Sequence, residues 1–174
     1  MVHLWAEINC GYATTSSHEN RLAMTTHILF VCTGNTCRSQ MAQAMAEQII
    51  AAQGWPITCA SAGIRASAGE PTTPAAVDVL SEQGIDWQGA SQQLNAELLQ
   101  QADVVWVMTD EHQQVAQQLV LTIEPAQRPS IALLGPQEVP DPLGCGRQAY
   151  VQLQQYLQSL LPQRLRALIP ELQA

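Results

Sequence analysis

The sequence contains no lysine, and this absence limits the partners that the protein can have. All seven basic residues are arginines, and fifteen acidic residues bring the formal net charge to -8. A strongly acidic surface argues against nucleic acid and anionic membranes as main partners, because both are negatively charged. An anionic substrate therefore has to be held by local groups, namely backbone N–H groups and Arg38.

Aromatic residues and long hydrophobic runs are also scarce. Aromatics make up 5% of the chain, with a single phenylalanine, which offers little material for a surface on which bases stack. The chain contains neither the hydrophobic segment of a secretory signal nor a run of about 18 apolar residues. Together with the five cysteines, these absences predict a soluble cytoplasmic protein with reduced thiols and no membrane partner.

The 174 residues, 47% of them hydrophobic, are enough for one compact domain with a core. Residues 1–24 show no sustained hydrophobic period, and we interpret them as a poorly packed N-terminal extension to a domain that spans residues 25–174. From Thr25 onward, strand and helix patterns alternate. This alternation predicts a single α/β domain with a four-stranded parallel sheet, flanked by helices and joined by right-handed crossovers.

Hydrophobic periodicity predicts the elements of this domain. The expected strands cover residues 27–32, 57–61, 103–108 and 130–134, and the expected helices cover residues 38–52, 74–83, 95–101, 110–120 and 147–161. Pro74 suits a first helical turn, Gly84 a helix stop, and Thr109 an N-cap. Pro162 is expected to break or kink the last helix, leaving a weaker segment at 163–169.

The most informative segment is the loop between the first strand and the first helix, residues 32–39, which reads Cys-Thr-Gly-Asn-Thr-Cys-Arg-Ser. Such a loop points its free N–H groups at whatever lies above the helix N-terminus. The partial positive charge of those N–H groups and the guanidinium of Arg38 both favour the thiolate form of Cys32. A cation in the first helical turn opposes the helix dipole unless an anion accompanies it. The loop therefore predicts thiolate attack on a phosphoryl group.

The Cys-x5-Arg spacing is weak evidence by itself, because Cys59 and Arg65 repeat it. The second pair lacks the surrounding pattern: Cys59 lies inside an expected strand, and no helix begins after Arg65. Only the first pair lies between a strand and a helix. The full context, rather than the spacing, carries the prediction.

A poor leaving group must be protonated as its bond to phosphorus breaks, and Asp141 is the best candidate for the acid. It lies in a loop stiffened by Pro140, Pro142 and Gly144, after the fourth expected strand. The other aspartates considered fall in or next to helices and strands, where solvated or capping roles are the default: Asp78, Asp86, Asp103 and Asp110. Because both loops follow the carboxyl ends of parallel strands, Asp141 and the Cys32 loop should share one face, at the switch point of the sheet. A purely turn-forming Asp141 is the alternative.

Two further loop residues each leave alternatives open. Cys37 could be filler, a metal ligand or a redox partner of Cys32. A zinc site is disfavoured because no other Cys/His pair has ligand spacing, so no metal or other cofactor is expected. Ser39 could cap the helix or bond to the thiolate.

These motifs resemble the low-molecular-weight protein-tyrosine-phosphatase family over roughly residues 25–168. The resemblance lies in residues 32–39, in the late Asp141-Pro142 pair, and in Ser61-Ala62-Gly63 after the second strand. It implies a cysteine-based phosphatase without metal, acting on phosphorylated proteins. Cys32 would be the nucleophile, Arg38 and the loop amides would hold the phosphoryl oxygens, and Asp141 would act as acid and then as base.

The resemblance also implies roles for the rest of the loop. Asn35, Ser39 and Ser61 would shape the loop and support the thiolate, and Cys37 would form a reversible disulfide with Cys32. The full set of expected substrate- and phosphate-binding residues comprises Thr33, Gly34, Asn35, Thr36, Cys37, Ser39 and Ser61.

Two details resemble the protein-arginine-phosphatase branch of the family. Thr36 stands where tyrosine-specific members usually carry a bulky aliphatic, and Leu143-Gly144 stand where those members tend to carry aromatics. The Thr36 hydroxyl would pair with the scissile P–N nitrogen, which an aliphatic would leave unpaired. The resemblance therefore implies phosphoarginine as the expected substrate, with phosphotyrosine as the alternative. Met108-Thr109-x-x-His112 also resembles this branch, although His112 is expected on the helix surface.

Other functions remain as alternatives. Gln40, in place of a common proline, also occurs in arsenate reductases of this fold, but the two further redox cysteines of those enzymes are missing after the third strand. A phosphate-dependent binding module would not need both nucleophile and acid. A thiol oxidoreductase using Cys32 and Cys37 is disfavoured by their Cys-x4-Cys spacing in a tight loop. A monomer is plausible, and the oligomeric state stays open.

Overall fold

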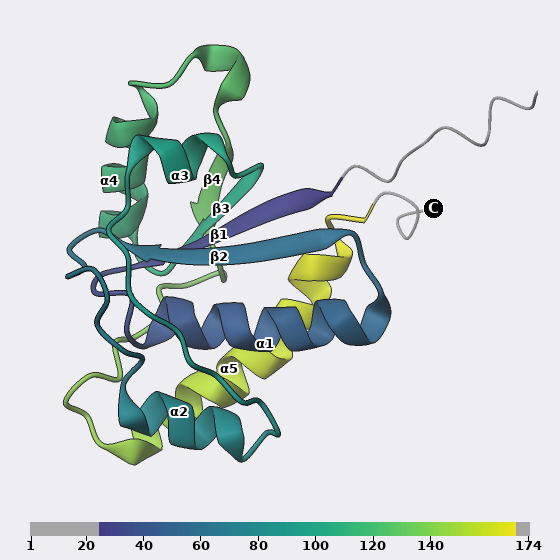
Figure 1. Ribbon diagram of the computed structural model, residues 1–174, viewed down its shortest axis with the longest axis vertical. Helices are drawn as coiled ribbons and strands as arrows, with labels where there is room; N and C mark the ends of the chain where they lie inside the picture. The colour runs from purple at the N-terminus through teal and green to yellow at the C-terminus, as the bar shows by residue number, and fades with distance from the viewer. Residues whose placement is uncertain (1–24, 170–174) are drawn as a thin grey trace, which may run out of the picture.

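The protein, described by a computed structural model over residues 25–169, contains one four-stranded parallel sheet (Figure 1). Its strands are β1 (Thr26–Cys32), β2 (Ile57–Gly63), β3 (Val104–Val107) and β4 (Ser130–Leu133). They lie in the order β2-β1-β3-β4, and each neighbouring pair is parallel. The predicted α/β sheet is confirmed. The interpretation of residues 1–24 lies outside the described residues.

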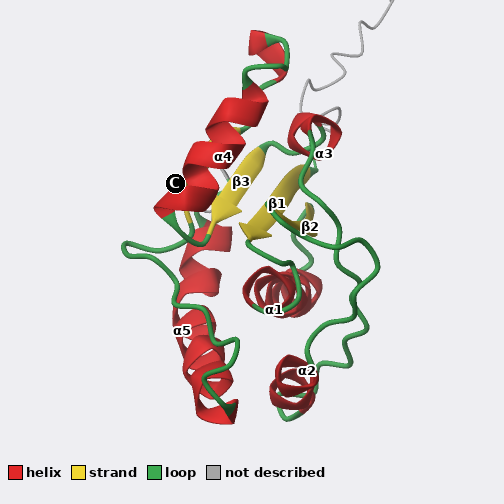
Figure 2. Ribbon diagram, turned by 90° about the vertical axis from the view of Figure 1, so that its left-hand side faces the viewer, coloured by secondary structure: helices red, strands yellow, loops and turns green. Residues whose placement is uncertain are grey.

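Helices cover both faces of the sheet (Figures 1 and 2). The helices are α1 (Arg38–Gln53), α2 (Pro74–Ser81), α3 (Ala96–Gln100), α4 (Asp110–Val120) and α5 (Arg147–Arg166), with a short 3-10 helix, η1 (Pro125–Gln127). Figure 2 shows α1, α2 and α5 on one side of the strands and α3 and α4 on the other. A parallel sheet covered in this way is buried on both faces.

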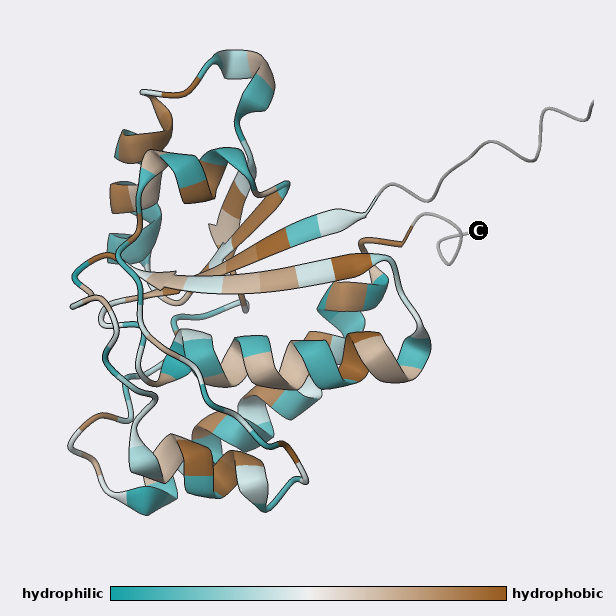
Figure 3. Ribbon diagram, in the orientation of Figure 1, coloured by the Kyte–Doolittle hydropathy of each residue, from teal (hydrophilic) through white to brown (hydrophobic). Residues whose placement is uncertain are grey.

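The sequence of β1 explains how two cores form. Ile28 and Phe30 belong to the hydrophobic cluster under α1 and α5, while Leu29 and Val31 belong to the cluster under α3 and α4. Because successive side chains of a strand point to opposite faces, a continuous apolar run serves both clusters. Figure 3 shows this run of hydrophobic residues along the central strands.

The strand order brings the two predicted loops together. The chain passes from β1 through α1 to β2 at one edge, then returns to β3 on the other side of β1, so the loop after β1 lies where the strand order reverses. The segment after β4 is tied to the same end of the sheet, because Val139 N–H donates to Met108 O over 2.8 Å. Both loops therefore emerge from the carboxyl ends of the strands, as ligand-binding loops do in open α/β sheets.

The predicted break at Pro162 is wrong, because α5 runs without interruption from Arg147 to Arg166. Leu157, Leu161 and Leu165 are spaced four residues apart on one face, and all three are fully buried. Pro162 itself lies on the exposed side of the helix, where water can bind a carbonyl that has lost its amide partner. Burial of the leucines thus outweighs the lost hydrogen bond.

The other element boundaries differ by only a few residues. Pro74 opens α2, and the side chain of Thr109 accepts a hydrogen bond from His112 N–H, so both helix starts are as predicted. The helix α2 ends at Ser81, and Gly84 follows with φ +74° in the turn that leaves it. A left-handed conformation of this kind is open to glycine at little cost.

Candidate active site

The loop between β1 and α1 is shaped by the side chain of Asn35. This residue is buried and has φ +55°, a left-handed conformation that asparagine tolerates better than most residues. Its Nδ2 donates to Ser39 Oγ and to Ser61 Oγ, both at 2.8 Å, and its Oδ1 accepts from Gln92 N–H at 2.9 Å. One amide therefore links the loop, the helix start, β2 and the segment before α3.

Cys32 lies at the centre of this loop with its sulfur 3.2 Å from the N–H of Asn35 and 2.9 Å from Ser39 Oγ. Because Ser39 Oγ already accepts from Asn35, its own proton is free to donate to the sulfur. The N-cap of α1 is Cys37, and no side chain caps it. Of the two alternatives for Ser39, the structure therefore favours the bond to the sulfur, so that two potential donors, Asn35 N–H and the Ser39 hydroxyl, contact Cys32 Sγ.

Arg38 connects this loop to the loop that carries Asp141. Its side chain is buried, Nη1 donates to Val139 O at 3.2 Å, and Nη2 donates to Thr33 Oγ1 at 3.0 Å. Nη2 also forms an ion pair with Asp141 Oδ2. The carboxylate of Asp141 thus lies beside this first-turn arginine, which the sequence predicted to hold an anionic substrate, and the structure brings together the two loops that the sequence placed on one face.

Asp141 combines both roles that its sequence context allowed. Its Oδ1 accepts from Leu143 N–H at 3.2 Å, which is a turn-forming bond, while Oδ2 faces Arg38. The side chain is 42% exposed. A carboxyl held by a guanidinium and open to the surface can reach a substrate that binds at the same point.

Cys37 and Thr36 lie on the side of the loop that faces α2 and α5. Cys37 Sγ is 3.4 Å from both Thr73 Oγ1 and Tyr150 Oη. Burial and the hydrogen bond with Cys37 raise the pKa of Tyr150. Thr36 O accepts from Thr73 N–H at 2.9 Å, while the Thr36 hydroxyl has only a weak contact of 3.7 Å with Cys37 Sγ. Cys32 and Cys37 are both free thiols.

His112 was expected on the surface of α4, and this prediction is wrong. The residue is 1% exposed, and its Nε2 lies 2.9 Å from Thr33 Oγ1. Burial, then the nearby charge of Arg38, lowers its pKa from 6.5 to about 4, so the ring is neutral at physiological pH. The N-cap at Thr109 could have predicted the burial of His112. It fixes where the helix starts, and therefore the direction in which the side chain of His112, three residues later, points.

Sequence reasoning also missed the residues that brace the loop from outside. Gln40 is buried, accepts from Trp87 Nε1 at 2.8 Å and donates to Ala90 O at 3.2 Å. It thereby ties the long segment before α3 to α1. Gln92, in that segment, holds Asn35. No local pattern marks these contacts, because they join residues about fifty positions apart.

The second Cys-x5-Arg pair forms no comparable site. Burial, followed by the charge of Glu47, raises the pKa of Cys59 to about 12, which is the opposite of what a nucleophile needs. Arg65 is exposed and forms an ion pair with Glu111. The pair lies outside any anion-binding loop, as its sequence context indicated.

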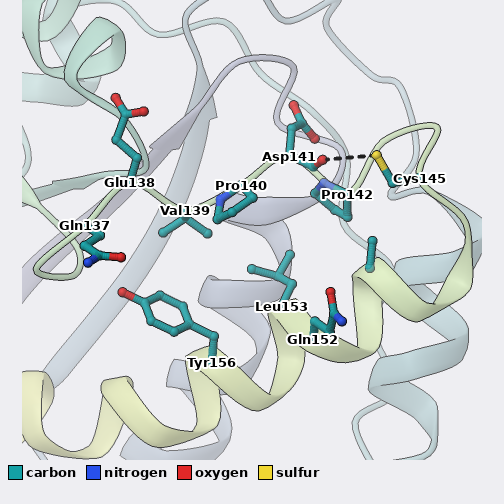
Figure 4. Close-up of a pocket in the computed structure, with 11 residues that line it drawn as sticks. Gln137, Glu138, Val139, Pro140, Asp141, Pro142, Cys145, Gln152, Leu153 and Tyr156 are labelled. Carbon is teal, nitrogen blue, oxygen red and sulfur yellow. Dashed lines mark hydrogen bonds between the residues drawn. The ribbon is translucent and has the colours of Figure 1, made fainter.

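A separate pocket of about 490 Å³ lies between the Asp141 loop and α5 (Figure 4). Pro140, Pro142, Leu153 and Tyr156 contribute to its walls, and none of residues 32–39 lines it. In Figure 4 the carboxylate of Asp141 is turned away from Leu153 and Tyr156. Asp141 is thus the one candidate catalytic residue that lines this pocket, and its carboxylate faces Arg38 instead of the pocket's apolar wall.

Among residues 25–169, no group of three or more His, Cys, Asp or Glu side chains is placed to hold a metal ion. In the same part of the chain, no helix is long and apolar enough to cross a membrane.

Comparison with known proteins extends the resemblance. The profile of the family described as low molecular weight phosphotyrosine protein phosphatase matches residues 27–174. The chain is 44% identical over 88 residues to the protein-arginine-phosphatase of Bacillus subtilis (strain 168), which covers 51% of this chain and 59% of that relative. It is 36% identical over 149 residues to the probable low molecular weight protein-tyrosine-phosphatase EpsP of Ralstonia nicotianae, covering 81% and 97%.

The fold of this chain is also similar to that of a solved phosphatase structure. A Cys-to-Ser mutant of the YwlE arginine phosphatase, with a phosphorylated active-site serine, superimposes with a TM-score of 0.76 at 35% sequence identity, covering 84% of this chain and 99% of that chain. The resemblance inferred from residues 32–39 and Asp141-Pro142 is thereby confirmed. With a profile match over nearly the whole described chain and a full-length relative at 36% identity, the chain belongs to the low molecular weight phosphotyrosine protein phosphatase family.

Proposed function

We propose that the chain is a protein phosphatase that hydrolyses phosphoarginine through a phosphocysteine intermediate. The observation that carries this proposal is the position of Arg38, whose Nη2 donates both to the Cys32 loop, at Thr33, and to Asp141. A nucleophile, an oxyanion-binding cation and a candidate acid thus converge at one point. This is the set that phosphoryl transfer to a thiolate requires.

In the first step, the thiolate of Cys32 attacks phosphorus while the loop amides and Arg38 bind the three phosphoryl oxygens. The P–N bond to the guanidino group breaks, and its electron pair takes the proton of Asp141. The products are phosphocysteine, a neutral guanidine and the carboxylate of Asp141. Asn35 N–H and the Ser39 hydroxyl, which contact the sulfur, support the thiolate before attack.

In the second step, the Asp141 carboxylate takes a proton from water as the water oxygen attacks phosphorus. The S–P bond breaks, and the thiolate of Cys32 leaves with inorganic phosphate as the other product. The phosphorylated serine in the Cys-to-Ser YwlE mutant supports a covalent phospho-enzyme in that relative. The proton taken from water returns Asp141 to the acid form that the first step uses, and in that form its Oδ2 no longer forms an ion pair with Arg38.

Two residues, Thr36 in the loop and Leu143 beside the acid, support the preference for phosphoarginine. The Thr36 hydroxyl, with only a weak contact to sulfur at 3.7 Å, is free to accept from or donate to a guanidino nitrogen. Leu143 is 61% exposed beside Asp141 and offers no aromatic surface for a phenol ring. The relative from Bacillus subtilis is named a protein-arginine-phosphatase. Phosphotyrosine is the second candidate, because the relative matched over 97% of its length is named a probable low molecular weight protein-tyrosine-phosphatase.

Initial rates on phosphoarginine and phosphotyrosine, measured side by side with Cys32→Ser as the blank, test this proposal. We expect wild type to prefer phosphoarginine and Thr36→Ile to shift the ratio of kcat/KM toward phosphotyrosine by about tenfold, since one hydrogen bond to the leaving group is lost. Faster phosphotyrosine turnover by wild type would keep the mechanism and reject the substrate. An unchanged ratio in Thr36→Ile would reject the role of Thr36.

The same Cys32→Ser variant separates an enzyme from a binding module. In the phosphatase, it should abolish turnover and still bind inorganic phosphate through Arg38 and the loop amides. A chain whose wild type binds phosphate without turning over either substrate, under reducing conditions, would instead be a binding module.

A further inference from the structure

His112 is a buried polar residue with no place in the chemistry proposed above. It reaches the site from α4, on the opposite face of the sheet from α1, and its Nε2 forms a hydrogen bond with Thr33 Oγ1 in the loop. Its other ring nitrogen, Nδ1, is buried without a hydrogen-bond partner. Buried polar groups left in this state are uncommon and call for a physical explanation.

The hydrogen bonds around Thr33 favour one tautomer of the ring. If Nδ1 carried the proton, a buried N–H donor would be unpaired, which is costlier than an unpaired acceptor nitrogen. The proton therefore belongs on Nε2, which donates to Thr33 Oγ1. That oxygen also accepts from Arg38 Nη2, so both acceptor positions of the hydroxyl are used. The side chain of Thr33 is held between a neutral imidazole and a guanidinium.

We propose that His112 is a positioning residue of the phosphate site, which holds the Thr33 hydroxyl as a fixed acceptor for Arg38 and so sets the orientation of the guanidinium. This inference rests on the proposed function, in which Arg38 binds the phosphoryl oxygens. His112 touches no reacting atom and acts through Thr33.

The proposed reaction explains why Arg38 needs such a support. Nη2 of Arg38 is shared between Asp141 and Thr33 in the structure. While Asp141 carries the proton that it will donate to the leaving group, it is uncharged and cannot form an ion pair with the guanidinium. Val139 O, on Nη1, and Thr33 Oγ1, on Nη2, then remain as the two acceptors that fix the plane of the side chain.

The charge state of His112 suits this role. The groups whose charges act on the ring are Arg38, which opposes protonation, and the carboxylates of Glu111, Asp141 and Glu138, which favour it. Burial and Arg38 prevail, so the ring stays neutral and adds no positive charge beside the guanidinium. A neutral donor can orient Thr33 without repelling Arg38.

Two substitutions of His112 separate positioning from packing. The amide nitrogen of glutamine can occupy the place of Nε2, whereas that of asparagine falls near Nδ1 and leaves Thr33 without its donor. Affinity for inorganic phosphate, measured by direct titration, should stay within about threefold of wild type in His112→Gln and fall by about tenfold in His112→Asn. Gln118→Asn, an exposed and uncharged change on the same helix, is the matched control and should leave phosphate affinity unchanged.

A double-mutant cycle with Thr33→Val shows whether His112 acts through Thr33. Thr33→Val should lower phosphate affinity by about tenfold, and adding it to His112→Asn should cost little more. Equal affinities in His112→Gln and His112→Asn, or losses that multiply in the double variant, would overturn the proposal. If His112→Asn does not fold, an unchanged phosphate affinity in Thr33→Val would by itself overturn the proposal. Absence of phosphate binding in wild type would instead reject the proposed function.

Discussion

At the scale of single residues, the site contains side chains that each bond to more than one partner. Asn35 bonds to Ser39 and Ser61, and Arg38 bonds to Thr33 and Asp141. In the free protein, Arg38 already faces an anion, because the carboxylate of Asp141 lies beside the cation that is proposed to bind phosphate. The price is that Arg38 must exchange one anion for another when substrate arrives.

Replacement of Asp141 by asparagine tests that exchange. Asp141→Asn should lower kcat by about 10²–10⁴, the usual effect of losing a general acid. Affinity for inorganic phosphate should stay equal or rise, because the variant removes the anion that competes for Arg38. Titration with phosphate and single-turnover rates measure the two effects separately. A marked loss of phosphate affinity would mean that Asp141 chiefly holds the loop in place.

At the scale of elements, the loop depends on the strand beside it. A Cβ atom built on Gly63, at the end of β2, would lie 2.5 Å from Thr33 O and 2.9 Å from Asn35 N. Both contacts are with backbone, which cannot rotate away. The end of β2 therefore sets the position of the phosphate loop by close approach, and this is why glycine is required there.

Gly63→Ala should displace the loop and lower kcat/KM by about 10- to 100-fold, since small misplacements of reacting groups are costly. Cys59→Ala, on the same strand and outside the site, is the control and should change kcat/KM by less than about twofold. Steady-state rates report both, with circular dichroism to show that each variant folds. Normal activity in Gly63→Ala would show that the loop tolerates the shift.

The helix α5 offers a second test at this scale. Pro162 lies inside the helix on its exposed side, so Pro162→Ala should restore a backbone hydrogen bond without disturbing Leu161 or Leu165. The free energy of unfolding should rise by about 1–3 kcal/mol, with activity unchanged. Urea denaturation measures this difference. A decrease would show that the rigidity of proline in the unfolded chain outweighs the lost bond.

At the scale of the whole molecule, the buried neutral His112 couples stability to pH. Its pKa is about 4 in the folded protein and near 6.5 when unfolded, so the unfolded chain binds the proton more tightly. The stability due to the neutral ring is complete above pH 6.5 and is lost as the pH falls toward 4. From pH 7 to pH 5, this loss amounts to about 2 kcal/mol, since one pKa unit is worth about 1.4 kcal/mol.

Urea denaturation of wild type and His112→Gln at pH 7 and pH 5 isolates this contribution, because the carboxylates are common to both proteins. Wild type should lose about 2 kcal/mol more than the variant over that interval. Equal losses would mean that the ring is not held neutral by its surroundings.

The parts of this protein that could be predicted from its sequence are those that depend on neighbouring residues. The apolar run before Cys32, the loop and the helix after Arg38 are contiguous, and alternating strands and helices limit the sheet to a few topologies. Asp141 could be placed on the same face as Cys32, because loops after parallel strands share one edge. No local rule predicts which side chains contact one another across that edge.

Long-range packing supplied the rest. His112 meets Thr33 across 79 positions, and Gln92 holds Asn35 across 57. The helix α5 continues past Pro162 because its leucines bury against a core built from distant elements. Hydrogen bonds and apolar burial depend on proximity in space, and periodicity along the chain records only which face of an element is buried, not what that face meets.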